Sequence, residues 1–302
     1  MSVADIAYAP LSAHLTAPVL ANLQTFADLL EAEAMPAGFI GECTRADLEL
    51  RHIFDSVLPA IAPETRERFP LNAGEGLNVF DLGAGSGLPS LPLAILYPQH
   101  KFHLLDAQEK RCRFAESAAA KLGLSNVTVY HGVVQDFPKK YAAAPKADVV
   151  VFRAFRKILA SLELALHVLS AAPKDRQRPG SAKSDGPRSL PASFQKTPQQ
   201  TSAKAPEAGC PPNFAGPLRS EAIALQSPKL LYWRSQRVPF SAAGEQRVTD
   251  LGYKTESFVK FESAASVLPR GLYTFAHETA AKKPYPRSWK KISADTLVDT
   301  ES

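Results

Sequence analysis

Glycines at alternate positions follow an acidic residue between residues 78 and 88. The segment reads Asn-Val-Phe-Asp-Leu-Gly-Ala-Gly-Ser-Gly-Leu, with the acid at Asp81 and the glycines at Gly83, Gly85 and Gly87. Glycine lets the backbone turn tightly and approach a ligand with no Cβ in the way. A loop that binds the pyrophosphate of a dinucleotide has two residues before its third glycine, and a carboxylate before the turn repels phosphate. The spacing and the acid therefore favour a ligand that carries a cationic group.

A second acid stands at the end of the next apolar run. The segment Phe-His-Leu-Leu-Asp ends at Asp106, 23 residues after Gly83. A carboxylate at such a strand end accepts hydrogen bonds from the two ribose hydroxyls of a nucleoside. The two segments together resemble the cofactor motifs of class I methyltransferases, whose glycine loop surrounds the methionine and sulfonium part of S-adenosylmethionine. The resemblance implies that S-adenosylmethionine is the cofactor and that it is held by Asp81, Gly83, Gly85, Gly87 and Asp106.

The pattern of apolar runs around these motifs predicts an α/β fold. From residue 77 onward apolar runs alternate with helical patterns, which is typical of βαβ units around a parallel sheet. We expect strands at 77–82, 101–106, 126–131, 147–153, 229–234, 253–262 and 271–277, and helices at 18–34, 45–60, 88–97, 108–123 and 156–170. The expected architecture is a Rossmann-like sandwich of the class I methyltransferase type, with an N-terminal helical extension and an antiparallel C-terminal strand pair.

Composition divides the chain into five expected regions. Residues 172–226 contain nine of the 25 prolines, and residues 172–220 contain eight Lys or Arg against three Asp or Glu, an excess equal to the whole net charge of +5. Such a segment buries too little apolar surface to offset the entropy of ordering, so we expect a disordered insertion. The regions are an N-terminal helical extension (1–70), a cofactor-binding core (71–171), the insertion (172–226), the remaining sheet strands (227–279) and a basic tail (280–302).

Several classes of protein are disfavoured by the composition. The 302 residues are 45% hydrophobic, which is enough to build a full core. There is no run of about 18 apolar residues and no secretory signal pattern, so we expect a cytoplasmic protein without membrane contact. The three cysteines, Cys43, Cys112 and Cys210, form no CxxC pair, which argues against disulfides and against a bound metal. We expect a monomer.

The end of the fourth expected strand narrows the choice of methyl acceptor. Class I methyltransferases that act on exocyclic amines usually carry an Asn/Asp-Pro-Pro-aromatic motif there, and those that act on pyrimidine C5 carry Pro-Cys. This chain has Phe-Arg-Ala-Phe at residues 152–155. An acceptor that is already nucleophilic at neutral pH, such as N7 of guanine, needs positioning rather than a general base. The segment therefore favours an acceptor of that kind.

Six segments together point to one family. They are Arg-His-Ile-Phe-Asp-Ser at 51–56, the glycine loop at 81–92, the second acid and following helix at 105–114, Val-Gln-Asp-Phe at 134–137, Arg-Ala-Phe at 153–155 and Lys-Pro-Tyr-Pro-Arg at 283–287. In these segments the chain resembles the bacterial RsmG/GidB family of small-subunit rRNA methyltransferases. The resemblance implies methyl transfer to N7 of a guanine in 16S rRNA, with the small ribosomal subunit or its assembly intermediate as partner.

The resemblance also implies which residues hold the cofactor. Gly83 and Leu88 fall at loop positions that hold the cofactor in the family, and Val134 and Gln135 fall where the family contacts the adenine. The family usually has Glu where this chain has Gln135. The Asn-Leu-Thr motif that the family carries upstream is not clearly present, and these departures bear on acceptor contacts more than on the cofactor.

Other positions are candidates for catalysis and for RNA contact. The resemblance places Arg153 at an arginine of the cofactor or acceptor site, and we expect it to be the catalytic residue that orients one of the two. His52 either lines the acceptor side or belongs to the core. Lys283, Tyr285 and Arg287 lie in the matching tail, where cations would pair with phosphates and the aromatic ring would stack on bases.

Three other functions stay open on the sequence. The chain could be a small-molecule methyltransferase of the same fold, with an incidental basic tail. It could be a non-catalytic RNA-binding protein that retains the cofactor pocket. A nicotinamide-dependent oxidoreductase is the third, and the spacing of the glycines counts against it.

Overall fold

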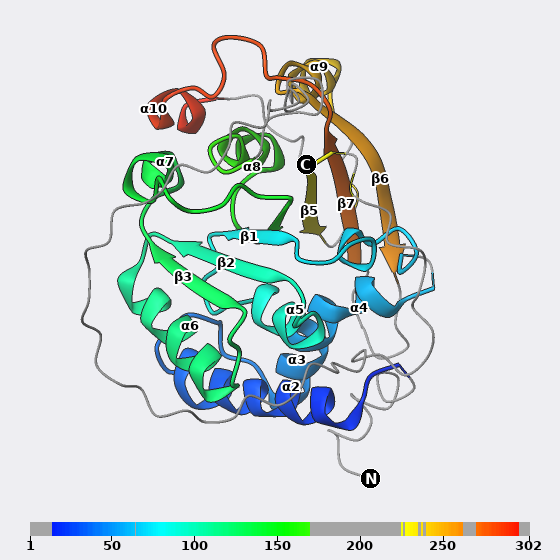
Figure 1. Ribbon diagram of the computed structural model, residues 1–302, viewed down its shortest axis with the longest axis vertical. Coiled ribbons are helices and arrows are strands. Elements are labelled where there is room, and N and C mark those ends of the chain that lie inside the picture. Colours follow the sequence, from blue (N-terminus) through cyan, green and yellow to red (C-terminus); the bar gives the residue numbers. More distant parts are fainter. Residues whose placement is uncertain are drawn as a thin grey trace, which may run out of the picture.

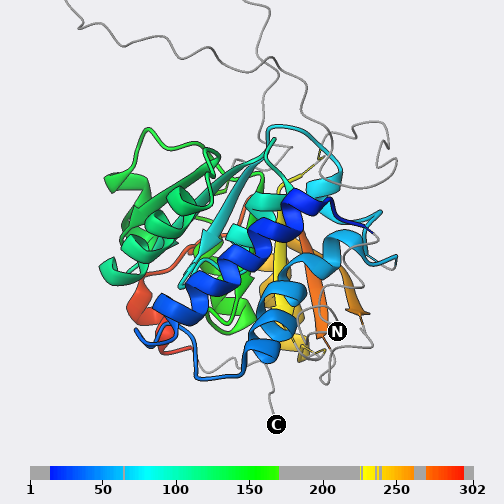
Figure 2. The same cartoon turned by 90° about the horizontal axis from the view of Figure 1, so that it is seen from below.

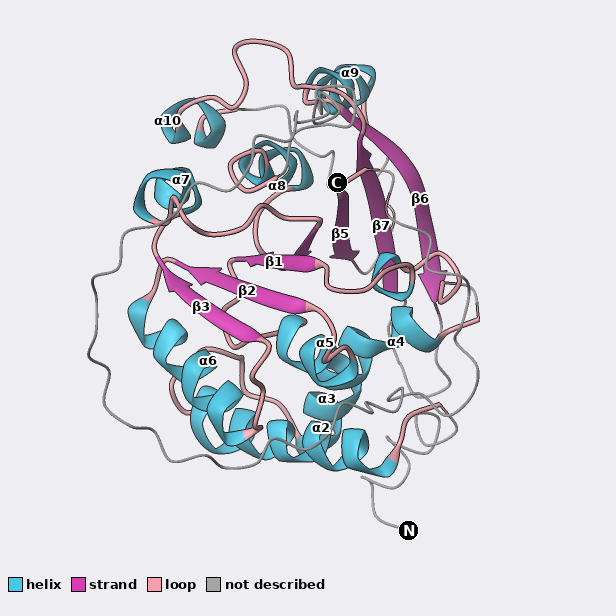
Figure 3. Ribbon diagram, in the orientation of Figure 1, coloured by secondary structure: helices cyan, strands magenta, loops and turns pink. Residues whose placement is uncertain are grey.

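A mixed sheet of seven strands forms the centre of the protein (Figures 1 and 3). The computed structural model describes residues 14–63, 65–169, 225, 227–234, 237, 240–261 and 270–295. All of the predicted insertion except residue 225 therefore lies outside the described residues. The strands are β1 (Asn78–Leu82), β2 (Lys101–Asp106), β3 (Val127–His131), β4 (Val149–Arg153), β5 (Lys229–Arg234), β6 (Tyr253–Phe261) and β7 (Arg270–His277). Their order across the sheet is β3-β2-β1-β4-β5-β7-β6.

The first five strands are parallel and the last two are antiparallel. Strand β1 pairs with β2 and β4, and these pairings continue in parallel to β3 and β5. Strand β7 then pairs antiparallel with both β5 and β6. The predicted antiparallel C-terminal pair is therefore confirmed, and β7 lies between β5 and β6 in the sheet. The carboxyl ends of the parallel strands meet at one edge, where a ligand site is expected in such folds.

Helices cover both faces of the sheet (Figure 3). They include α5 (Ser90–Leu96) and α6 (Glu109–Lys121) on one face, and α7 (Phe137–Lys140), α8 (Ile158–Ala165) and α10 (Trp289–Ser293) on the other, with α9 (Ala242–Asp250) packed against β6. Successive strand residues point to opposite faces. Val79 accordingly lies in the core beneath α5, whereas Phe80 lies in the core beneath α8. The predicted α/β sandwich is confirmed.

The N-terminal helices pack on the same face as α5 (Figure 2). Helix α2 (Ala17–Leu29) continues as a π-helical turn (Leu30–Ala34). A second helical run is formed by α3 (Arg45–Leu48), a π-helical segment (Glu49–Phe54) and α4 (Asp55–Ile61). The two helices predicted at the N-terminus are present, and their side chains share one apolar core with the sheet.

A proline inside α4 leaves one backbone carbonyl without its usual helical donor, and a side chain of the sheet donates a hydrogen bond to it instead. Pro59 has no N–H, so it cannot make the usual helical hydrogen bond to the carbonyl of Asp55. The indole Nε1–H of Trp233, on β5, donates to that carbonyl at 3.0 Å. The helix and a strand far along the chain are therefore tied together by a buried hydrogen bond.

Three short helices have no counterpart in the sequence prediction. Helices α7 and α10 are only one turn long, and α9 carries few apolar residues, so that none has a clear helical periodicity. Helix α9 is capped at its N-terminus by Ser241, whose hydroxyl accepts a hydrogen bond from the N–H of Gly244 at 3.2 Å. No helix in the described part of the chain combines the length and the apolar character that crossing a membrane requires.

We expect Phe26→Ala to destabilise the fold. Phe26 is fully buried on the face of α2 that packs in the core shared with α5 and the sheet. Removing the ring leaves a cavity, and the free energy of unfolding should fall by about 3–5 kcal/mol. Gln24→Ala, two residues away on the exposed face, should change it by less than about 0.5 kcal/mol. Urea denaturation measures both, and similar losses would contradict the packing assigned to α2.

Candidate functional site

A cavity of about 610 Å³ opens at the carboxyl edge of the parallel strands. Its lining comes from the loops that follow β1, β2, β3 and β4, from α8 and from the C-terminal segment. Four residues that the sequence assigned to a cofactor line it together, namely Gly83, Asp106, Val134 and Gln135. The volume is typical of sites for small ligands and cofactors.

The glycine loop requires glycine at the positions that the sequence singled out. Gly83, Gly85 and Gly87 have φ values of +80°, +56° and +83°, in the left-handed region. A Cβ on Gly83 would lie 2.2 Å from Cδ2 of Phe155, and one on Gly87 would lie 2.5 Å from Cδ1 of Leu91. A Cβ on Gly85 would meet only open space apart from the carbonyl of Gly83, at 3.9 Å. The loop thus forms a cradle with room above its centre.

The carboxylate of Asp106 is held by two backbone donors. Its Oδ2 accepts a hydrogen bond from the N–H of Gly85 at 2.9 Å, and its Oδ1 accepts one from the N–H of Gln108 at 2.8 Å. The residue is 7% exposed and lines the cavity. Each oxygen has a second lone pair, so the fixed carboxylate can still accept a hydroxyl of a ligand. These features fit the ribose of a nucleoside cofactor.

Asp81 lies below the loop, outside the cavity lining. The Ser90 hydroxyl donates to its Oδ2 at 2.7 Å, and the side chain is 1% exposed. Burial raises the pKa of Asp81 to about 7, with a further increase from the nearby Asp106 and opposing effects from the Ser90 hydrogen bond and Arg153. Leu88, also assigned to the cofactor, is buried in the core on the α5 face. Both residues support the loop from beneath, and direct contact with a cofactor stays a prediction.

Arg153 connects the end of β4 to the N-terminal helices. Its Nη1 donates to the carbonyl of His52 and to Oγ of Ser56, both at 2.9 Å, and its Nη2 donates to the carbonyl of Arg51. The π-helical geometry of residues 49–54 leaves these carbonyls available. Arg153 does not line the cavity described above, and the half-buried His52 contacts it through its backbone. The guanidinium therefore has a structural role, and its predicted catalytic role is untested.

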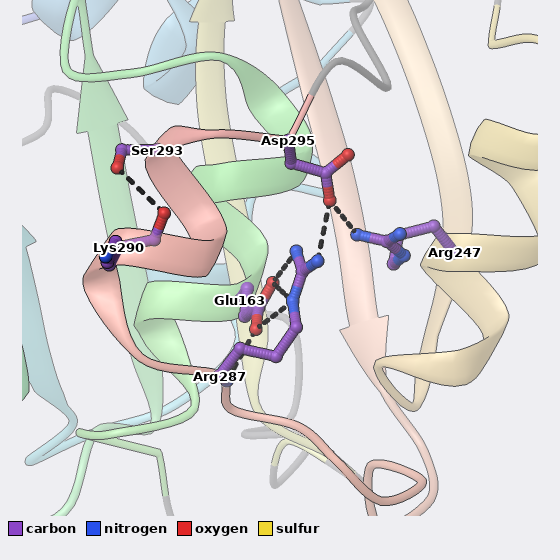
Figure 4. A network of polar contacts seen from close by, with 6 residues as sticks. All are labelled: Glu163, Arg247, Arg287, Lys290, Ser293 and Asp295. Carbon is purple, nitrogen blue, oxygen red and sulfur yellow. Dashed lines mark hydrogen bonds and ion pairs between the residues drawn. The ribbon is translucent and has the colours of Figure 1, made fainter.

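The tail is exposed at Lys282, Lys283, Lys290 and Lys291, but its Arg287 is docked against the rest of the protein. Arg287 is 14% exposed and forms an ion pair with the buried carboxylate of Glu163, with Nη2 and Oε2 2.6 Å apart (Figure 4). The guanidinium carbons of Arg247 and Arg287 lie 5.3 and 5.2 Å from the centre of the Tyr285 ring. These partners occupy the two side chains that we expected to contact RNA. Lys283 is exposed, in agreement with the prediction.

The sequence reasoning missed several residues of the cavity. Phe155 lies against Gly83, and the exposed Lys139 and Arg156 stand among the lining residues. His167 also lines the cavity, and burial lowers its pKa. Phe155 stands in the Arg-Ala-Phe segment that the sequence analysis compared with the family, but its packing against Gly83 was not predicted. The preceding Ala154 has a φ of +50°, which non-glycine residues rarely adopt and which sequence does not reveal.

The fold and the cavity define the class of this protein. The strand order with an antiparallel β7 between β5 and β6, the glycine loop after β1 and the acid that ends β2 are those of a class I α/β methyltransferase. The family model described as rRNA small subunit methyltransferase G, GidB, matches residues 19–174, which is more than half of the chain. The chain belongs to this family.

Curated relatives carry the same family name. The Ribosomal RNA small subunit methyltransferase G of Geobacillus sp. (strain WCH70) is 32% identical over 152 residues, which are 50% of this chain and 60% of that protein. Its counterpart in Limosilactobacillus reuteri (strain DSM 20016) is 36% identical over 148 residues, which are 45% of this chain and 59% of that protein. The chain thus spans about 60% of the length of these relatives.

Solved structures resemble the chain at lower identity. An O-methyltransferase from Bacillus cereus in complex with SAH is 12% identical, with a TM-score of 0.45, over 84% of this chain and 90% of that chain. A SAM-dependent methyltransferase from Aquifex aeolicus is 17% identical, with a TM-score of 0.39, over 73% of this chain and 93% of that chain.

Among the described residues no group of His, Cys, Asp and Glu is arranged to hold a metal ion.

We expect Asp81→Asn to remove a pH dependence of stability. The pKa of Asp81 is about 7 in the folded protein and about 3.9 in an unfolded chain. The folded state binds more protons between these values, so the free energy of unfolding of the wild type should fall as the pH rises through this window and level off above it. Asn keeps an oxygen for the Ser90 hydroxyl and does not titrate. Urea denaturation of both proteins between about pH 5 and pH 8 tests this, and a constant difference between them would contradict it.

We expect Arg153→Ala to lower stability as well as any activity. The substitution removes the side-chain donor to the carbonyl of Arg51, and a buried group left unpaired costs about 1–3 kcal/mol. The carbonyl of His52 also loses Arg153 but keeps the hydrogen bond from Oγ of Ser56. Arg153→Lys keeps the charge but cannot reproduce the forked geometry, so it should restore only part of the loss. Thermal unfolding of both variants measures the effect. An Ala variant as stable as the wild type would mean that these contacts do not support the fold.

Proposed function

We propose that this protein transfers a methyl group from S-adenosylmethionine to N7 of a guanine in 16S rRNA. One observation carries the proposal: the family match covers the segments that bring Gly83, Asp106 and Val134 to a single cavity. The curated relatives are named as small-subunit ribosomal RNA methyltransferases, which supports methylation of this RNA over the part of their length that the chain spans. The substrate is taken to be the small ribosomal subunit or its assembly intermediate, with the protein acting as a monomer in the cytoplasm.

The size of the cavity and the groups that line it suit S-adenosylmethionine. Bound there, this cofactor supplies an electrophilic methyl group. Gly83 contributes backbone to the cavity lining, and the space beside Gly85 is open where a Cβ would stand. The fixed carboxylate of Asp106 would accept the ribose hydroxyls. Val134 and Gln135 would line the adenine end. The protein's part is to bind and orient, which lowers the barrier by proximity.

Methyl transfer to N7 of guanine requires the protein to orient the acceptor and does not require a general base. N7 of guanine carries a lone pair at neutral pH, so no side chain has to remove a proton before methyl transfer. The cations at the cavity mouth, Lys139 and Arg156, are exposed and suited to phosphates that flank the target nucleotide. Phe155 lines the cavity beside Gly83. Its ring would lie near both the cofactor and the target guanine.

The direct test is methyl transfer to ribosomal substrates. Purified protein, labelled S-adenosylmethionine and either naked 16S rRNA or small subunits should give label that maps to N7-methylguanine. Label in metabolite extracts but not in either RNA would instead indicate a small-molecule methyltransferase. Cofactor binding with no transfer to any ribosomal substrate would indicate a non-catalytic RNA-binding protein.

We expect Gly83→Ala to weaken cofactor binding strongly. The new Cβ would force the ring of Phe155 to move within the cavity, and affinity should fall by about tenfold or more. Gly123→Ala is a matched control, because Gly123 also has a positive φ, of +67°, but a Cβ there meets no atom within 4 Å. Calorimetry with S-adenosylhomocysteine measures both affinities. Equal affinities of the Gly83→Ala and Gly123→Ala variants would show that Gly83 does not belong to the cofactor site.

A further inference from the structure

The C-terminal segment forms one wall of the cofactor cavity. After β7 the chain is tied to the end of α9, where the N–H of Lys282 donates to the carbonyl of Asp250 at 2.8 Å. It then crosses α8 and ends in α10 (Figure 1). Pro286, Arg287 and Ser288 line the same cavity as Gly83 and Asp106. This wall lies outside the segment that the family model matches.

A network of charged groups holds the wall in place (Figure 4). Oε1 of Glu163, on α8, accepts hydrogen bonds from the backbone N–H of Arg287 at 2.6 Å and from its Nε at 3.0 Å. Oε2 of Glu163 accepts from Nη2 of Arg287 at 2.6 Å. Both the position of the backbone and the direction of the side chain at residue 287 are thereby fixed from α8.

The same network closes the far end of the segment. Oδ2 of Asp295, just after α10, lies 2.8 Å from Nη1 of Arg287 and 2.6 Å from Nη1 of Arg247 on α9. The pKa of Arg287 is raised above its ordinary value, first by its hydrogen bonds to Glu163 and also by Asp295. Two acids and two arginines thus balance one another, and Glu163 is only 1% exposed. A buried carboxylate of this kind is costly once its partner leaves, so the wall is strongly held when docked.

We propose that Glu163, Arg287 and Asp295 are positioning residues that keep the segment 285–295 docked, and that docking of this segment and binding of the cofactor favour each other. The inference rests on the proposed function, because it takes the cavity to be the cofactor site. A cofactor that contacts residues 286–288 gains those contacts only when the segment is docked. Binding must therefore shift the segment toward the docked state, and by linkage a docked segment raises cofactor affinity.

The role differs from RNA contact, which the basic character of the tail suggested. If Arg287 served RNA phosphates, its loss would weaken RNA binding and its salt dependence while the affinity for the cofactor stayed the same. If Arg287 positions the wall, its loss weakens cofactor binding even when no RNA is present. Titration with the cofactor product in the absence of RNA separates the two roles.

The experiment compares binding of S-adenosylhomocysteine to four variants by calorimetry. Glu163→Gln and Asp295→Asn remove one charge each from the network, and both should weaken binding by about tenfold, a usual size for coupling between sites. Arg287→Lys keeps the charge, so it should lose less. Lys282→Ala is the control, because Lys282 lies just before the segment, pairs with Asp250 of α9 and does not line the cavity. It should bind as the wild type does.

Hydrogen exchange of peptides that cover residues 285–295 gives a second readout, independent of turnover. S-adenosylhomocysteine should slow exchange there in the wild type and much less in Asp295→Asn. This variant keeps the buried Glu163–Arg287 pair, so it should remain folded even if Glu163→Gln does not fold. Wild-type affinity in Asp295→Asn, with unchanged protection of the segment, would overturn the inference. A wild-type protein that binds no S-adenosylhomocysteine would instead refute the proposed function.

Discussion

The pairing of β1 with β2 on one side and β4 on the other determines where every part of the cavity lies. Asp81 is in register with Leu104 of β2 and with Val151 of β4, so the three strands reach their carboxyl ends at the same edge. The loop after β1 is then tied to the end of β2, because the N–H groups of Gly83 and Ala84 both donate to the carbonyl of Leu105. The glycine loop, Asp106 and the turn after β4 therefore lie close together at the carboxyl edge of the sheet.

Three buried acids around this edge are stabilised in three different ways. Asp106 accepts hydrogen bonds from backbone N–H groups, which keeps a carboxylate ready for a ligand. Asp81 has one hydroxyl donor and little solvent, and its pKa rises to about 7. Glu163 has a full arginine partner. The partner that each carboxylate finds decides whether it contacts ligand, supports the loop or secures another segment.

The segments outside the family match complete the structure of the matched part. Strand β5 extends the parallel sheet, Trp233 holds the carbonyl that Pro59 leaves free, and the segment 285–295 supplies a wall of the cavity. The match at residues 19–174 covers the loops after the first four parallel strands that line the cavity, whereas another wall of the cavity comes from residues 286–288.

The sequence by itself determined the local features. Buried strands such as β1 read as apolar runs, alternating glycines after Asp81 marked the tight loop, and the alternation of apolar runs with helical patterns predicted βαβ units. Hydrophobic period and glycine chemistry are local properties. Only the tertiary structure decided the partners of the charged residues. Arg153 and Arg287 looked like free functional cations. Yet Arg153 binds the carbonyls of Arg51 and His52, and Arg287 binds Glu163, all more than 100 residues away along the chain. No local pattern records such a contact, since an ion pair depends on which elements the folded sheet brings side by side.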